Sequence, residues 1–177
     1  IRTSSDALVA SYITPTGLMF EFYHNTDSSW EFSYQYSGSS KPISASADFV
    51  ISESHFVIRD STSLRLYSTS KSSSGKIKSV SLISEISSSF SPGLLLINNV
   101  EDTIVLRDGA GKLVVYDISA QELSPKSFGI DMDDISHVSM LDDLILVVNS
   151  TNFYSVFQMI SGSPQLRHNT TVSDEYP

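Results

Sequence analysis

The chain has 177 residues, of which 40% are hydrophobic and 18% charged, and its 11 Lys and Arg against 20 Asp and Glu give a formal net charge of −9. This composition excludes a wholly disordered acidic chain and indicates one folded domain of ordinary size. The acidic balance disfavours nonspecific binding to nucleic-acid phosphates. The sequence contains no cysteine, which excludes disulfides, thiolate zinc sites and a cysteine nucleophile.

The same features predict a cellular location. No apolar run is long enough to span a membrane, and the first residues lack the pattern of a signal peptide. We therefore expect a cytoplasmic or nuclear protein. The alternative is the secretory pathway, where the sequons at Asn149 and Asn169 would be sites of N-glycosylation. The 37 Ser and 10 Thr of the chain make two sequons the number expected by chance.

Short alternating or continuous apolar runs, broken by Ser, Gly, Asp and Asn, predict β-strands along the whole chain. In chain order they form four hairpins with further strands between them. The expected hairpin strands are 7–12 with 18–23, 56–59 with 64–67, 103–107 with 113–117, and 144–148 with 153–157. Additional strands are expected at 30–36, within 43–51, and at 76–83, 93–97 and 135–140. The run 93–97 is continuously apolar, which is typical of a strand buried on both faces.

The four hairpins form an internal repeat. Val9, Val57 and Val105 are spaced by 48 residues, and the fourth hairpin follows the third at a spacing nearer 41. Each unit consists of a buried strand, a hairpin and an outer edge strand. Such a unit exposes two apolar faces, which only neighbouring units can cover. We therefore predict that the three valines occupy matching places in successive sheets.

This pattern resembles the blades of β-propellers of the WD-repeat and related families. In the third copy, Tyr116 and Asp117 stand where these families often place a Trp-Asp pair. The resemblance implies an all-β fold, a β-propeller of about four blades of four antiparallel strands. The chain would be a single propeller domain or a propeller fragment, with approximate blades at 1–40, 41–90, 91–131 and 132–177. A β-sandwich is the alternative fold.

Two observations favour a part of a larger ring over a small closed one. No buried strand is evident before the first hairpin, and the sequence begins at Ile1 without Met. An apolar flank of such a part would need more chain, or a partner, to cover it.

The motifs that could indicate catalysis or ligand binding do not match the patterns that such chemistry requires. Residues Gly109 to Lys112 match part of the sequence pattern of a phosphate-binding loop. A strand is expected directly after them, so a hairpin turn is the better interpretation. The acidic cluster of Asp131, Asp133 and Asp134 lacks the Gly and Glu of a calcium loop. The four histidines are not paired at metal-ligand spacing. We expect no catalytic residue, cofactor or metal, and we interpret the Ser-rich segments 37–40, 68–75 and 84–92 as solvated loops.

Two sets of residues are candidates for contacting a partner. Trp30, Phe32, Tyr34 and Tyr36 alternate along one strand, so we expect all four on one face, either in the core or as an exposed contact row. The pairs Arg59-Asp60 and Arg107-Asp108 recur at equivalent places. They would stabilise turns or form a row of polar contacts on one rim. The acidic cluster at 131–134 is a third candidate contact.

The resemblance implies a non-catalytic protein-protein interaction scaffold, a propeller subunit or fragment within a multi-subunit assembly. Its partners would be other protein subunits, or the rest of a larger propeller. Two alternatives remain open. One is a secreted glycan-binding propeller, suggested by the aromatic row and the sequons. The other is a propeller hydrolase that uses the acidic loop residues.

Overall fold

In the computed structural model the chain is all-β, as expected, and the structure describes residues 1–3, 7–26, 29–37, 43–98, 102–126, 128, 135–151 and 153–171. Within these ranges the strands form four four-stranded antiparallel sheets. Sheet 1 contains β1 (Arg2–Thr3), β2 (Ala7–Thr14), β3 (Gly17–Asn25) and β4 (Trp30–Tyr36). Sheet 2 contains β5 (Asp48–Ile51), β6 (His55–Arg59), β7 (Ser63–Lys71) and β8 (Ile77–Ser87).

The other two sheets repeat this arrangement. Sheet 3 contains β9 (Phe90–Asn98), β10 (Thr103–Asp108), β11 (Leu113–Asp117) and β12 (Ser124–Lys126). Sheet 4 contains β13 (Ile135–Leu141), β14 (Leu144–Asn149), β15 (Phe153–Ile160) and β16 (Ser163–Thr171). In every sheet the four strands lie side by side in chain order.

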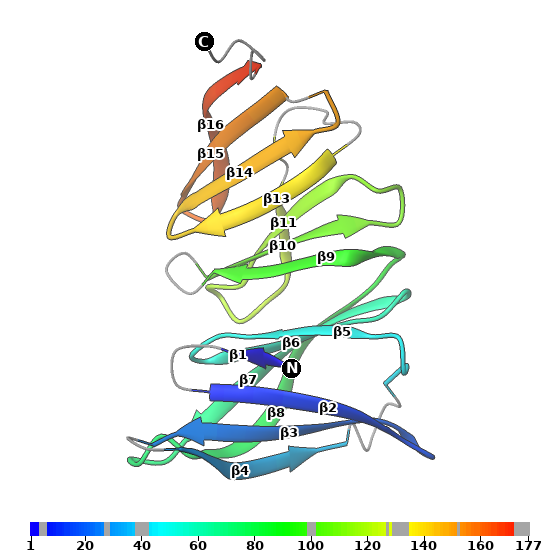
Figure 1. Cartoon of the computed structure of the whole chain (residues 1–177), viewed down its shortest axis with the longest axis vertical. Helices are drawn as coiled ribbons and strands as arrows, with labels where there is room; N and C mark the ends of the chain where they lie inside the picture. Colours follow the sequence, from blue (N-terminus) through cyan, green and yellow to red (C-terminus); the bar gives the residue numbers. More distant parts are fainter. Residues whose placement is uncertain are drawn as a thin grey trace.

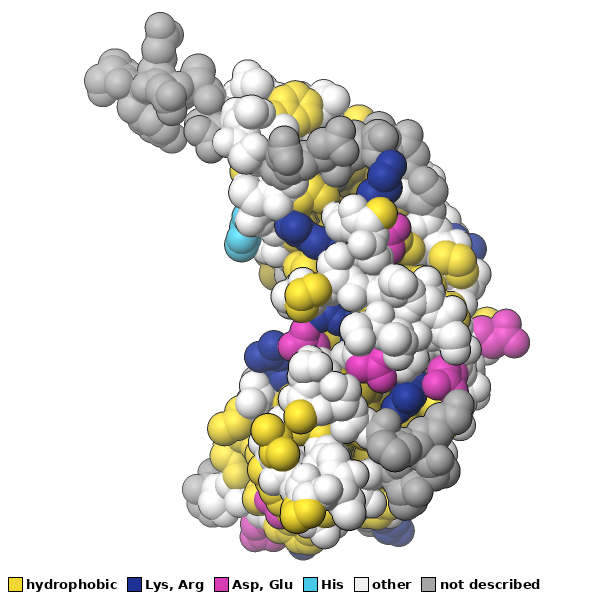
Figure 2. Space-filling model, turned by 90° about the vertical axis from the view of Figure 1, so that its right-hand side faces the viewer, with side chains coloured by type: hydrophobic (Ala, Val, Ile, Leu, Met, Phe, Trp, Pro, Cys, Tyr) yellow, Lys and Arg dark blue, Asp and Glu magenta, His cyan; other side chains and the backbone are white. Residues whose placement is uncertain are grey.

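The sheets stack along the long axis of the molecule, with sheet 1 at one end and sheet 4 at the other (Figure 1). The first strands of the sheets contact one another in series, β1 with β5, β5 with β9 and β9 with β13. The stack is bowed into a crescent (Figure 2). This is the geometry of propeller blades arranged around an axis, with the first strand of each blade innermost.

The predicted repeat is confirmed by the register of the hairpins. Val9, Val57 and Val105 lie on the second strands of sheets 1, 2 and 3, and each is fully buried. Each also pairs with a residue of the third strand on one side and of the first strand on the other. Each valine faces the next sheet along the chain, because it belongs to the cluster buried between its own sheet and that sheet.

Three hydrophobic clusters fill the spaces between the four sheets. The cluster between sheets 1 and 2 is aromatic: the ring of Phe56 lies 5.1 Å from that of Phe20 and 5.0 Å from that of Phe22. The other two clusters are mainly aliphatic. Leu95 packs into the cluster on one side of β9 and Leu96 into the cluster on its other side, which confirms β9 as a strand covered on both faces.

Two expectations are wrong in detail. A first strand does precede the first hairpin, because β1 pairs with β2 through Arg2 opposite Val9. β1 contains only Arg2 and Thr3, so no apolar run marks it in the sequence. The Ser-rich segments 68–75 and 84–92 are loops only in part, since Ser68 to Lys71 end β7, Ser84 to Ser87 end β8, and Phe90 to Pro92 begin β9. Ser side chains here lie on strand positions that face solvent or a partly covered edge, so they do not interrupt pairing.

Gly109 belongs to a tight hairpin turn, as predicted, and the structure supplies the reason for a glycine there. Its backbone N–H donates to the carbonyl of Ser89, in the short connection between β8 and β9, at 2.7 Å. A Cβ atom at this position would lie 2.4 Å from the Cβ of Ser89. Close approach of two backbones therefore selects glycine.

We predict that Phe56→Ala lowers the free energy of unfolding by about 3 to 5 kcal/mol, because the ring is fully buried at the centre of the aromatic cluster. Chemical denaturation followed by far-UV circular dichroism measures this. Phe32→Ala is the matched control, since the Phe32 side chain is 54% exposed, and it should cost less than about 1 kcal/mol. Equal losses for the two variants would contradict the assignment of the core.

Candidate interaction surfaces

The recurring arginines join neighbouring sheets. Arg59 is buried, donates from Nη1 to the carbonyl of Leu94 on β9 at 2.6 Å, and forms an ion pair with Asp48. Arg107 donates from Nη2 to the carbonyl of Ile135 on β13 at 2.5 Å. Both arginines follow the same buried valine position by two residues and therefore face the next sheet. Each is thus a hydrogen-bonded link from one blade to the innermost strand of the next.

The aspartates that follow these arginines stabilise turns. The Asp60 carboxylate accepts hydrogen bonds from the backbone N–H groups of Thr62 and Ser63 at 2.8 and 2.7 Å. The Asp108 carboxylate does the same for Ala110 and Lys112, both at 2.9 Å. These are turns closed by an acceptor side chain. Arg and Asp of each pair therefore act separately, and a role of either in contacting a partner stays a prediction.

Asn149 occupies the corresponding place in sheet 4. Its Oδ1 accepts from the backbone N–H groups of Thr151 at 3.0 Å and Phe153 at 2.9 Å. The 41-residue step from Asp108 to Asn149 matches the shorter spacing of the last repeat. The residue before Asn149 is Val148, so sheet 4 has an aliphatic side chain where sheets 2 and 3 have arginine.

A buried cluster of charged side chains lies beside the turn that Asp60 closes. Arg65 donates from Nε to Glu85 at 3.1 Å, and its Nη2 lies 3.7 Å from the Asp60 carboxylate. Burial raises the pKa of Asp60, but the hydrogen bonds from Thr62 and Ser63 outweigh burial and hold that pKa below its usual range. The carboxylate therefore stays ionised opposite Arg65. The group ties β7 to β8 and to the turn before β7.

The aromatic row is divided between two faces, which corrects the expectation that all four rings share one. The register of β4 against β3 shifts between the pairs Phe22–Tyr34 and Tyr23–Phe32, so Ser33 is an extra residue. Tyr34 and Tyr36 pack on the core between sheets 1 and 2. Trp30 and Phe32 lie on the opposite face, 41% and 54% exposed. A bulge of one residue reverses the side on which all later residues lie.

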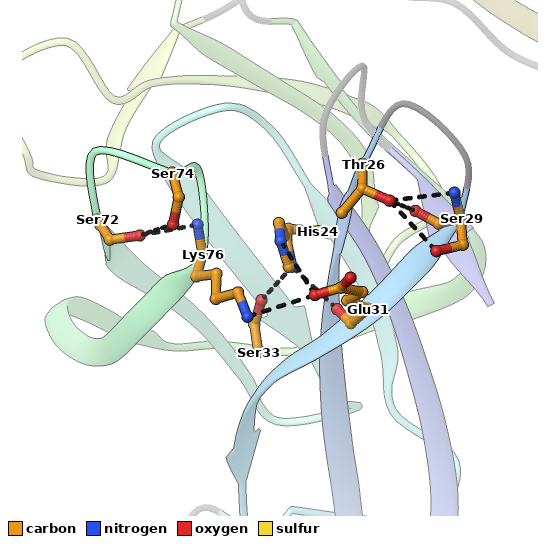
Figure 3. Close-up of polar contacts among 8 residues, drawn as sticks. All are labelled: His24, Thr26, Ser29, Glu31, Ser33, Ser72, Ser74 and Lys76. Atoms are coloured by element: carbon orange, nitrogen blue, oxygen red, sulfur yellow. Dashed lines mark hydrogen bonds and ion pairs between the residues drawn. The ribbon is translucent and has the colours of Figure 1, made fainter.

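A polar cluster connects β4 with sheet 2, and sequence reasoning did not find it (Figure 3). The buried imidazole of His24 has its Nδ1 3.0 Å from the carbonyl oxygen of Glu31 and 3.2 Å from the hydroxyl of Ser33. The Glu31 carboxylate lies 3.4 Å from the ammonium of Lys76, which precedes β8 of the next sheet. His24 and Glu31 are cross-strand neighbours of β3 and β4, whereas Lys76 is distant in sequence and reaches Glu31 because sheets 1 and 2 lie side by side.

A buried histidine makes a similar contact between sheets 2 and 3. His55 begins β6 and its Nδ1 lies 3.9 Å from the carboxylate of Asp102, in the turn before β10. Burial lowers the pKa of His55, and the negative charge of Asp102 opposes that effect only in part. The histidine is therefore neutral in the folded protein over a wider pH range than in the unfolded chain.

Among the described residues, no sheet packs on the outer face of sheet 1 or on the outer face of sheet 4. The first end face is the side of sheet 1 that points away from sheet 2. Its residues are identified by cross-strand pairing, since paired residues share a face, and they are Leu8, Ala10, Tyr12, Met19, Glu21, Tyr23, Trp30, Phe32 and Gln35. Hydrophobic side chains are visible at this end of the molecule (Figure 2).

A carboxylate with aromatic neighbours lies in the first end face. The hydroxyls of Tyr12 and Tyr23 donate to the two oxygens of Glu21 at 3.2 and 2.7 Å. Gln35 donates to the hydroxyl of Tyr12 at 2.7 Å. The hydrogen bond to Glu21 is the main cause that raises the pKa of Tyr23. This face therefore combines apolar area with one negative charge.

The last end face is the side of sheet 4 that points away from sheet 3. Pairing assigns it His137, Ser139, Leu141, Leu144, Leu146, Val148, Tyr154, Val156, Gln158 and His168. Arg167 joins it, because its Nε donates to Oε1 of Gln158 at 2.9 Å. The exposed fractions of Leu141 and Leu144 are 71% and 40%. This face is aliphatic and carries charges of both signs, because Nε2 of Gln158 also donates to the carboxylate of Asp143 at 2.6 Å.

The remaining candidates have simpler places. Asp131, Asp133 and Asp134 lie outside the described residues. Asn169 is exposed on β16 and pairs with Ser155. Among the described residues, no three or more His, Asp or Glu side chains gather as metal ligands. No helix in the described part of the chain is long and apolar enough to cross a membrane.

Solved structures that are similar to this chain include two WD40 domains. The WD40 domain of SCAP from fission yeast superposes with a TM-score of 0.60 at 10% identity, over 92% of this chain and 42% of that one. The fission yeast SREBP–SCAP binding-domain complex gives 0.58 at 14% identity, over 92% and 48%. The WD40 domain of Toxoplasma gondii coronin gives 0.54 at 8% identity, over 96% and 44%.

These likenesses establish the fold as that of a divergent WD-like β-propeller, which confirms the fold expected from the repeat. The chain spans less than half the length of each of these three structures. No family model and no curated protein sequence matches it.

We predict that Arg107→Met lowers the free energy of unfolding by about 1 to 3 kcal/mol. Methionine keeps an unbranched apolar stem but leaves the Ile135 carbonyl without its charged donor. Thermal and urea denaturation measure the change. Arg2→Met, at an exposed arginine, should change stability by less than about 0.5 kcal/mol. An Arg107 variant as stable as that control would show that the link between sheets 3 and 4 is dispensable.

We predict that stability falls as the pH drops below the ordinary histidine pKa of 6.5, because His55 has a lowered pKa in the folded state. The unfolded chain then binds a proton that the folded chain resists. His55→Gln should flatten this dependence between about pH 7.5 and 5.5, measured as the urea midpoint at each pH. His137→Gln, at an exposed histidine, should leave the slope unchanged. Parallel slopes for wild type and His55→Gln would contradict the assignment.

Proposed function

We propose that this protein is a non-catalytic scaffold for protein-protein interaction that acts within a multi-subunit assembly. One observation carries the proposal: no sheet of the described residues packs on the two end faces, although they correspond to faces that are buried at every junction inside the described part of the chain. A contiguous apolar sheet face with a few placed polar groups is typical of a surface that binds protein.

The contacts of the polar side chains support a structural and not a catalytic use of the chain. Arg59 and Arg107 join sheets, Asp60 and Asp108 close turns, and His24 with Glu31 and Lys76 connects sheet 1 to sheet 2. Each of these groups has an intramolecular partner that explains its position. The fold likeness to the SREBP–SCAP binding-domain complex supports a protein as the ligand. We place the protein in the cytoplasm or nucleus, as the cysteine-free sequence predicts.

Site-specific photo-crosslinking in cells tests the proposal. A benzophenone amino acid replaces Phe32 on the first end face or Tyr154 on the last. We expect discrete protein adducts from one or both positions, because a partner held on a sheet face lies within reach of the probe. Adducts are identified by mass spectrometry.

The matched control carries the same probe at Leu82, which is 43% exposed on the outer strand of sheet 2, between the two ends. It should give no discrete adduct. Absence of adducts from both end faces, or the same adducts from Leu82, would contradict an interaction scaffold that works through its ends.

A further inference from the structure

We infer that each arginine link between sheets is built together with a bulge in the strand that receives it, and that arginine and bulge act as one device that docks a sheet on its neighbour. The bulge interrupts the pairing of the innermost strand and turns a backbone carbonyl toward the preceding sheet. The arginine of that sheet binds the carbonyl. The device occurs between sheets 2 and 3 and again between sheets 3 and 4.

The first bulge lies in β9. The register of β9 against β10 shifts, so that the four residues 91–94 stand opposite the single residue Arg107. Arg59 of sheet 2 donates to the carbonyl of Leu94, the last residue of this segment, at 2.6 Å. Gly93 has a φ of 101°, a conformation that glycine adopts at little cost and other residues rarely adopt. The acceptor carbonyl therefore lies at the end of a bulged segment and not within a regular ladder.

The second bulge lies in β13. The register of β13 against β14 shifts between Ile135 and His137, so that Ser136 is an extra residue in this strand. Arg107 of sheet 3 donates to the carbonyl of Ile135, directly before the extra residue, at 2.5 Å. Both arginines thus bind a carbonyl that adjoins an interruption of the innermost strand in the next sheet.

Sheet 2 is the internal comparison. Its innermost strand, β5, pairs with β6 in unbroken register from Asp48 to Ile51. The preceding sheet 1 has Ser11 two residues after Val9, where sheets 2 and 3 have arginine after the matching valine. Within the described residues, a bulged innermost strand follows a sheet with the arginine, and the regular β5 follows a sheet without it.

The geometry of a β-strand explains this association. In a regular strand the carbonyls point along the sheet toward neighbouring strands, and the side chains point to its two faces. An arginine that arrives from another sheet therefore meets side chains. A bulge leaves a residue unpaired and bends the strand, which turns a carbonyl out of the ladder. A charged donor then binds that carbonyl more strongly than a neutral donor would.

A serine in each interruption holds the bulge in place. The hydroxyl of Ser91 donates to the carbonyl of Asp108 at 2.6 Å. The hydroxyl of Ser136 donates to the carbonyls of Val148 and Asn149, at 3.0 and 3.1 Å, as a bifurcated hydrogen bond. Asp108 and Asn149 are the equivalent turn acceptors of sheets 3 and 4. The two bulges are thus fastened at the same place on the second strand, which marks them as repeated features of the fold.

A double-mutant cycle between sheets 3 and 4 tests the inference. Arg107→Met removes the donor, and deletion of Ser136 removes the bulge while Ile135 stays opposite Asn149. Urea denaturation followed by circular dichroism gives the folding equilibrium constant of all four chains. We expect the fold-change caused by Arg107→Met to be more than about fivefold larger with Ser136 present than with Ser136 deleted. A ratio below about twofold would overturn the inference.

Arg59→Met combined with the same deletion is the matched control. Arg59 serves the junction between sheets 2 and 3, so its effect should be the same with and without Ser136, to within about twofold. Equal coupling of both arginines to the deletion would show a general weakening of the fold, and the inference would then be wrong.

Ser136→Ala keeps the test decisive if the deletion chain does not fold. This variant retains the chain length but removes the hydroxyl that fastens the bulge. We expect Arg107→Met to have an effect about threefold smaller in this background, because the Ile135 carbonyl is no longer held toward sheet 3. An equal effect in both backgrounds would contradict the coupling of arginine and bulge. The measurement is made on the isolated chain, so either result leaves the scaffold proposal to its own crosslinking test.

Discussion

Each sheet of this protein has two apolar faces, and burial of both is possible only when other sheets lie on either side. The hydrophobic effect acts on the area removed from water, so a four-stranded sheet alone would leave much of its apolar surface exposed. In sheet 2 this requirement is met in full. Phe56 and Ile58 pack toward sheet 1, while Val57 and Leu66 pack toward sheet 3. Within the described residues, sheets 1 and 4 meet the requirement on one side only, and the proposed function follows from that asymmetry.

The three junctions between successive sheets are packed with different kinds of side chain. Between sheets 1 and 2, aromatic rings supply most of the buried volume, and Ser11 stands where the later sheets have arginine. The junctions after sheets 2 and 3 are aliphatic and add Arg59 and Arg107 as directional links to the next innermost strand. Edge-on aromatic pairs have preferred geometry, which aliphatic side chains lack. A charged donor on a fixed carbonyl sets the register that the aliphatic surface leaves loose.

The repeat could be predicted from the sequence, because it depends only on the local alternation of apolar residues and on one spacing. Val9, Val57 and Val105 could be aligned from their 48-residue steps, and the turns after Asp60 and Asp108 from their composition. The role of Arg59 could not be predicted, because its partner on β9 is an ordinary backbone carbonyl that has no sequence signature. The bulge at Ser33 was equally hidden, since strict alternation of aromatic residues gave no sign of an extra residue. Contacts that depend on the relative rotation of two sheets, such as Glu31 with Lys76, lie beyond local pattern altogether.

The handedness of β-sheets explains why each junction in the described part of this chain joins unlike faces of two sheets. Strands twist in one sense, so the two faces of a sheet are not equivalent surfaces, and successive sheets of a propeller always meet by unlike faces. Every junction within the described part of this chain follows that order: the side bearing Val9, Val57 or Val105 meets the side bearing Phe56, Ile104 or Ile145.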